Sequence, residues 1–174
     1  MDLRIIETGN GGDVLLSGND LAVDYTFETM IYLALFGGNP GNNTSTDRLI
    51  NEQGFDWWGN TTLLPNQPLL QFNSLTEHTL NTTTLNSAGR IIIQNAVIAD
   101  LGFMTDFAEI TVVVVIPTVD TVNITIRLQQ PDNLQIKEYI FIWDSLKQAL
   151  TGAYVPNSNI KLLFGLQSTL QTTL

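Results

Sequence analysis

Few residues of this 174-residue chain have the types and spacing that catalysis or metal binding requires. The only histidine, His78, follows Glu77 in a stretch predicted to be helical. A histidine acts as a general base when a nucleophile and an orienting carboxylate lie beside it in space. The chain has no Gly-x-Ser-x-Gly elbow and no cysteine, which excludes thiolate zinc sites and cysteine nucleophiles. His78 is therefore predicted to be a surface or packing residue.

The glycines and acids near the N-terminus fit structural roles. The run Gly9–Gly12 precedes a predicted strand, whereas a phosphate cradle needs the free amides of a helix N-terminus. Asp13, Asp20 and Asp24 lack the spacing of a calcium loop and suit turns and helix caps. Two acids that meet in space could cleave glycosides, but no spacing selects a pair. The sequence therefore predicts no enzyme, no catalytic residue, no metal site and no cofactor.

Trp57 and Trp58 are the most informative residues, and they lie in a dense aromatic stretch, Gly54–Asn60. Adjacent tryptophans project in different directions, so one can anchor the segment while the other points outward. Two interpretations are equally favoured: both rings fill the domain, or one is an anchor in a protein interface. An exposed tryptophan also suits sugar stacking, so a carbohydrate-binding or adhesin-like module remains the alternative.

Charge and composition exclude several classes of function. The chain has 7 basic and 17 acidic residues, and nine of the acids but only two bases lie in residues 1–56. Nucleic-acid binding depends on clustered Lys and Arg, which are absent. No apolar run is long enough to span a membrane, and the charged start is not expected to be a signal peptide. A chain without cysteine is compatible with folding in a reducing cytoplasm.

Periodicity predicts strands followed by helices over the first 100 residues. Glycine-rich turns separate short strands up to residue 24, and a helix capped by Asp24 or Thr26 ends at Gly37-Gly38. A long polar segment, 37–67, precedes two further helices over 68–80 and from 82–84 to Asp100. The stripes predicted to face the core are Phe27, Met30, Ile31, Ala34 and Leu35 in the first helix and Leu85, Ala88, Ile92, Ile93, Ala96, Val97 and Ala99 in the last.

The period then changes to that of strands. Residues 110–116 are apolar on both faces, which predicts a central strand, and residues 122–128 alternate cleanly, which permits a position near an edge. After these, 136–143 is a predicted strand, 144–150 a short helix capped by Asp144, and 160–164 a last strand. The expected fold is α+β, a small antiparallel sheet with a central β-hairpin packed against two or three helices.

The order of these features resembles a known family. A Gly-Asn-Asp-Leu-Ala-Val-Asp stretch (18–24), a helix ending in Leu33–Phe36 and a polar loop closing on Trp57-Trp58-Gly59-Asn60 precede helices and a hairpin. This order is similar to the small baseplate proteins of Mu-like contractile phages, which carry a Gly-Trp-Trp-Gly-Asp motif there. They are related to baseplate wedge or sheath-initiator proteins with a so-called lysozyme-like fold. The match covers roughly residues 13–130.

The resemblance implies a structural role in the virion. It implies a baseplate wedge-like domain over residues 1–130 with a C-terminal extension over 131–174, made in the host bacterial cytoplasm. The implied partners are other wedge proteins, the tail sheath and the tail tube, within a homo-oligomeric ring. Sheath subunits join through shared strands, so an initiator must offer sheet edges. The hypothetical interface residues are Trp57, Trp58, Gly59, Thr125 and Arg127, and Pro117 and Arg127 are expected to protect an edge before assembly.

Overall fold

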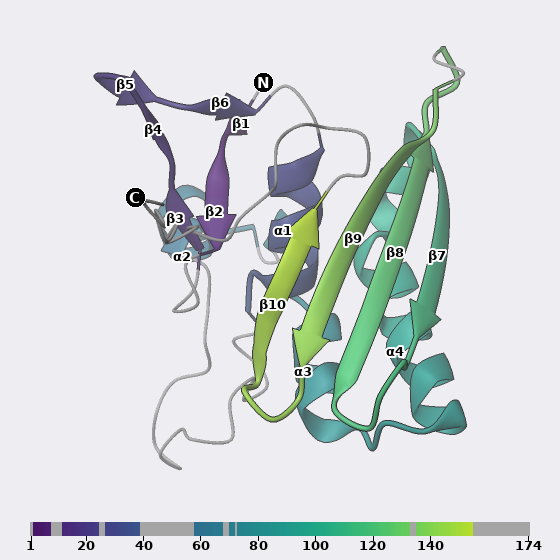
Figure 1. The fold of residues 1–174 in the computed structure, drawn as a ribbon. Helices are drawn as coiled ribbons and strands as arrows, with labels where there is room; N and C mark the ends of the chain where they lie inside the picture. The colour runs from purple at the N-terminus through teal and green to yellow at the C-terminus, as the bar shows by residue number, and fades with distance from the viewer. Residues whose placement is uncertain are drawn as a thin grey trace, which may run out of the picture.

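The computed structural model shows an α+β fold in which one antiparallel sheet is covered by helices on one face (Figure 1). The structure describes residues 2–7, 12–24, 27–38, 58–67, 70–71, 73–132 and 135–154. The predicted fold class is confirmed. The predicted strand at 160–164 lies outside the described residues, as does most of the polar segment 37–67.

The main sheet has four strands in the order β10-β9-β8-β7. These are β7 (Glu109–Val115), β8 (Thr121–Gln129), β9 (Lys137–Asp144) and β10 (Ala149–Tyr154), and all neighbours are antiparallel. The predicted hairpin is confirmed as β7 and β8. The prediction that its first strand is central is wrong, because β7 lies at the edge and β8 lies between β7 and β9.

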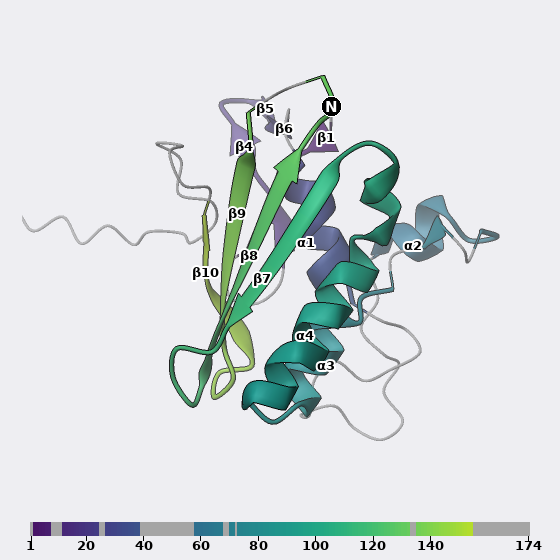
Figure 2. The same cartoon turned by 90° about the vertical axis from the view of Figure 1, so that its right-hand side faces the viewer.

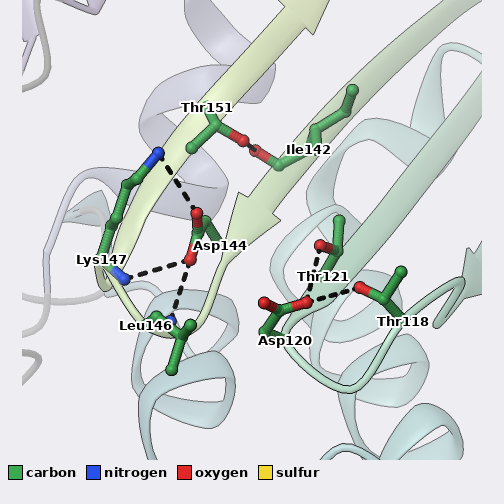
Figure 3. Close-up of polar contacts among 8 residues, drawn as sticks. All are labelled: Thr118, Asp120, Thr121, Ile142, Asp144, Leu146, Lys147 and Thr151. Carbon is green, nitrogen blue, oxygen red and sulfur yellow. Dashed lines mark hydrogen bonds and ion pairs between the residues drawn. The ribbon is translucent and has the colours of Figure 1, made fainter.

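The chain after residue 130 contributes half of this sheet, because β9 pairs with β8 along its whole length. The strand predicted at 136–143 is thus confirmed, whereas the helix predicted at 144–150 is wrong. The Asp144 carboxylate accepts hydrogen bonds from the amides of Leu146 and Lys147 in a tight turn (Figure 3). Gln148 has a φ of 48°, and the chain reverses there into β10. Asp144 therefore stabilises a turn rather than the first turn of a helix.

Three helices cover one face of the sheet: α1 (Glu28–Phe36), α3 (Thr76–Thr82) and α4 (Ser87–Asp100). Figure 2 shows the sheet and the helices as two layers. Asp24 lies in a strand, and Phe27 occupies the N-cap position of α1 without a side-chain bond; Thr26, the other predicted cap, lies outside the described residues. The glycine stop at the other end is confirmed by Gly37 at the C-cap and by Gly38 with a φ of 82°.

The N-terminal strands form small antiparallel pairs beside α1: β1 (Asp2–Leu3) with β6 (Val23–Asp24), β2 (Ile5–Glu7) with β3 (Gly12–Val14), and β4 (Leu16–Ser17) with β5 (Asp20–Leu21). The short strands predicted there are confirmed. The Thr29 hydroxyl joins them to α1, since it donates to the Leu3 carbonyl and accepts from the Ile5 amide.

The core lies between α1 and the sheet. Every residue of α1 from Ile31 to Phe36 is buried, so this helix is enclosed all round and not only along the predicted stripe. The Phe36 ring stacks on Trp143 of β9, with 6.2 Å between ring centroids. Trp143 is thus part of the core.

Candidate functional site: the open edge of the sheet

The tryptophan segment can be placed only in part. Trp57 lies outside the described residues, and Trp58 and Gly59 begin a short helix, α2 (Trp58–Leu63). The Gln71 amide fixes the end of α2, because its Nε2 donates to the carbonyls of Asn60 and Leu64. The plug and interface interpretations of the two indoles both stay predictions.

Thr125 and Arg127 lie on β8, in the interior of the sheet. Their side chains point to the sheet face opposite the helices, where Thr125 stands between Val113 of β7 and Ile140 of β9. Arg127 donates from Nε to the Glu138 carboxylate across the β8–β9 pair at 2.6 Å. The expectation that Arg127 protects an edge is wrong, because its strand has neighbours on both sides.

The directions of the backbone amides follow from one bond at the end of the sheet. The Ser145 amide donates to the Asp120 carbonyl at 2.8 Å, and these two residues continue the β8–β9 register. Bonded and non-bonded pairs alternate along an antiparallel ladder, so every second residue of β8 from Val122 onward bonds to β9. The residues between them, including Thr125, therefore direct their N–H and C=O groups toward β7.

The same alternation assigns the amides of β7. Residues opposite Thr125 and its alternate neighbours, such as Val113, bond inward to β8. The N–H and C=O groups of Ile110, Val112 and Val114 then point away from the sheet, and within the described residues no strand pairs with that side. We call these outward groups, with their strand, the β7 edge. In Figure 2 the β7 edge lies beside α4.

Within the described residues, the β7 edge has little of the usual protection against strand pairing. Its register with β8 is continuous over seven residues, and five of these are β-branched and apolar. Val113 and Val115 are 40% and 50% exposed on the face away from the helices. Proteins normally blunt such edges with charges, bulges or short strands. Glu109 supplies one charge at the start of β7, and Pro117 follows its end.

The opposite edge of the sheet is better protected. The pairing of β10 with β9 shifts register between Leu150 and Gly152, which marks a bulge or irregularity. Such a shift twists an edge strand and interrupts its row of amides. Of the two edges of the main sheet, β7 is thus the more regular and the less protected.

The sheet face opposite the helices carries both apolar and polar side chains next to this edge. Val113 lies in register with Thr125 and Ile140, and Val115 with Asn123 and Ile142. We call this surface the outer sheet face, and Figure 1 views it directly. An exposed apolar patch next to a free strand is typical of an interaction surface.

Two acids of the described part of the chain, Asp100 and Asp120, have structural partners. The Asp100 carboxylate accepts bonds from the Leu75 amide and from the amide and hydroxyl of Thr76, so it caps α3. Burial raises the pKa of Asp100, although these hydrogen bonds oppose the shift. A hydrogen bond from Thr118 lowers the pKa of Asp120, which lies in the turn between β7 and β8 (Figure 3).

A search of the described residues for three or more His, Cys, Asp or Glu side chains that could share a metal ion found no such group. Among the helices that the structure describes, none has the length and hydropathy to cross a membrane.

Sequence reasoning missed one apolar surface on α4. Ile92 was predicted to face the core but is 53% exposed, and Ala88 and Ala99 are exposed as well. The buried side of α4 consists of Gly89, Ile93, Ala96 and Val97. Three consecutive isoleucines begin at Ile91, and they cannot share one face of a helix. That run was the available signal for a second apolar face.

Comparisons with protein-family models, with curated proteins and with solved structures found no match to this chain.

Proposed function

We propose that this chain is a non-enzymatic structural subunit that binds a partner protein by accepting a β-strand at the β7 edge. The observation that carries the proposal is the row of outward backbone groups at Ile110, Val112 and Val114 beside exposed apolar side chains. Strand addition derives its affinity from such main-chain groups and its specificity from alternate side chains. β7 is apolar on both of its faces, and a partner that covers the exposed valines would explain this pattern.

The particular assembly that we propose is the baseplate wedge of a contractile phage tail. The support is the resemblance of the Trp57-Trp58-Gly59-Asn60 segment and its flanking elements to the baseplate proteins of Mu-like phages. The proposed partners are other wedge proteins and the sheath and tube proteins, and the added strand would begin the sheath. The proposed interface is therefore on β7, and not at Thr125 and Arg127 as the sequence suggested, because those two residues lie inside the sheet.

Lysine on β7 tests the strand addition. Val113→Lys and Val115→Lys introduce ammonium groups at exposed positions and leave the core-facing valines unchanged. A lysine on an edge strand opposes pairing, because an incoming strand must desolvate it. The matched control is Val119→Lys, since Val119 is 90% exposed in the turn after β7. The doubly substituted β7 variant should be folded but depleted from purified tails, whereas the control should be incorporated like the wild type.

Quantitative mass spectrometry of tails purified from the producing phage separates the two parts of the proposal. Absence of the wild-type protein from the tails would refute the baseplate assignment. Incorporation of the β7 variant at the wild-type level would refute the strand addition while leaving the baseplate assignment intact.

Residue-resolved hydrogen exchange gives a second readout of strand addition. The outward amides of Ile110, Val112 and Val114 should exchange quickly in the isolated protein and slowly after assembly. The inward amides of Thr111 and Val113 should be protected in both states. If all five amides keep the same rates after assembly, no strand adds to β7.

A further inference from the structure

The exposed side of α4 is uncharged and largely apolar. Ile91, Ile92 and Ile98 are 51%, 53% and 49% exposed. With Ala88, Asn95 and Ala99 they form what we call the outer α4 face, and all six residues recur at helical spacing opposite the buried side. The helices of soluble domains normally expose charged and polar residues there.

The outer α4 face has no charge, although the chain has a net charge of −10. The two charged residues of α4 lie off this face. Arg90 donates to Gln94 on the same helix, and Asp100 caps α3. A continuous uncharged and apolar helix face on an acidic protein is a feature of contact surfaces. It lies on the helix layer, while the exposed valines of β7 point to the outer sheet face.

We propose that the outer α4 face binds the same face of a second copy of this chain, with the two α4 helices antiparallel about a two-fold axis at Asn95. In this arrangement Ile91 contacts Ile98 of the second copy, and Ile92 contacts Ala99 of the second copy. The two Asn95 side chains meet at the axis. The proposal does not depend on strand addition at β7 or on the phage assignment.

The sequence of α4 is self-complementary about Asn95, which an isologous interface requires. Small Ala88 lies toward one end of the face, and at the other end the chain continues with Gly102, where an added Cβ would meet no atom within 4 Å. An asparagine amide both donates and accepts, so two Asn95 side chains satisfy each other and fix the register. An interface with a different protein would not require this symmetry.

The charge distribution permits a second copy as the occupant. Two copies of a strongly acidic chain repel each other, so they can associate only through a surface that brings no acids together. The outer α4 face meets this condition.

The dimer should be weak in isolation. A helix of 14 residues is about 21 Å long and about 10 Å wide, so one face offers a few hundred Å². This is less than the roughly 800 Å² that each partner buries in a standard interface. Sedimentation velocity of the full chain should therefore show monomers at low concentration and dimers at high concentration.

Charge substitutions at Ile91 and Ile98 test the pairing. Ile98→Glu and Ile91→Lys should each raise the dissociation constant more than tenfold, because each buries two unpaired charges in the symmetric dimer. An equimolar mixture of the two variants should form a heterodimer, in which the new Lys faces the new Glu and the remaining isoleucines stay in contact. Ile136→Glu is the matched control, since Ile136 is 60% exposed and precedes β9, outside the outer α4 face. Circular dichroism should show all variants folded.

Each result decides the proposal. Dimers that are lost in the two single variants, kept in Ile136→Glu and recovered in the mixture support it. A chain that stays monomeric at every concentration overturns it, as does a dimer that Ile98→Glu leaves intact. A dimer that Val113→Lys abolishes also overturns it, because that result would place the contact at β7. Failure of strand addition in tails leaves this outcome unaffected.

Discussion

Proline at Thr125 should destabilise the folded domain itself, because the amide of this residue points to β7 inside the sheet. The substitution removes one ladder bond and leaves the facing carbonyl of Val113 without its partner. A net hydrogen bond contributes about 1 kcal/mol and a buried unpaired acceptor costs about 1–3 kcal/mol. With disruption of both adjoining ladders, we expect a loss of about 3–5 kcal/mol, a large part of the roughly 5–15 kcal/mol that stabilises a typical domain.

Val112→Pro is the matched comparison. The N–H of Val112 points outward from β7, so proline removes no ladder bond there. The cost of fitting a proline φ into a strand is common to both variants and largely cancels. Val112 is 7% exposed and loses some packing in the substitution, for which we expect about 1–2 kcal/mol. Thr125→Val keeps the amide and the β-branched shape and should change stability by less than about 0.5 kcal/mol.

Thermal unfolding followed by circular dichroism measures the difference. For a chain of this size 1 kcal/mol corresponds to about 2–4 °C, so Thr125→Pro should lower Tm by about 6–20 °C and Val112→Pro by less than half as much. Urea unfolding should give the same ranking with similar m-values. If Val112→Pro is as destabilising as Thr125→Pro, the inferred direction of the β7 amides is wrong, and with it the reasoning for an open edge.

Two further predictions concern the packing of the domain. Asp100→Ala should destabilise the protein by about 1–2 kcal/mol, because it removes the cap of α3, whereas Asp100→Asn keeps an acceptor and should cost less. Since burial raises the pKa of Asp100, the folded state holds this proton to higher pH than the unfolded state. Its contribution to stability should therefore fall as pH rises from the ordinary aspartate pKa through the raised one, and a pH series in which Asp100→Asn keeps the wild-type slope would contradict this. Trp143→Ala should cost about 3–5 kcal/mol, because the indole is 2% exposed and stacks on Phe36, and urea unfolding with a loss below about 1 kcal/mol would show that the stack is not part of the core.

The resemblance drawn from the sequence and the geometry of the structure support different parts of the proposed function. The Trp57-Trp58-Gly59 segment led to the baseplate, but the structure describes neither Trp57 nor the environment of the Trp58 side chain. The open edge of β7 was not predicted, since the sequence favoured the second strand of the hairpin as the exposed one. The two lines of support are therefore independent, and the experiments on tails test them separately.

The sequence by itself determined the features that depend on neighbours along the chain. The alternation at 122–128 specified β8, the glycines at 37 and 38 ended α1, and the helical periodicity up to Asp100 specified that α4 is a helix, although not which of its sides is buried. Each of these signals acts over a few residues, because backbone conformation and side-chain direction are local properties.

Only the tertiary structure decided which strand lies at the edge and which apolar residues stay exposed. Val112 and Val113 look alike in sequence, and they differ because helices cover one face of β7 while the described residues leave the other open. β8 is an internal strand because β9 pairs with it, starting at Lys137. The resemblance drawn from the sequence had assigned this part of the chain to a C-terminal extension. A strand becomes internal when another segment of the chain pairs with its second side. The periodicity of the strand itself does not show whether such a segment exists.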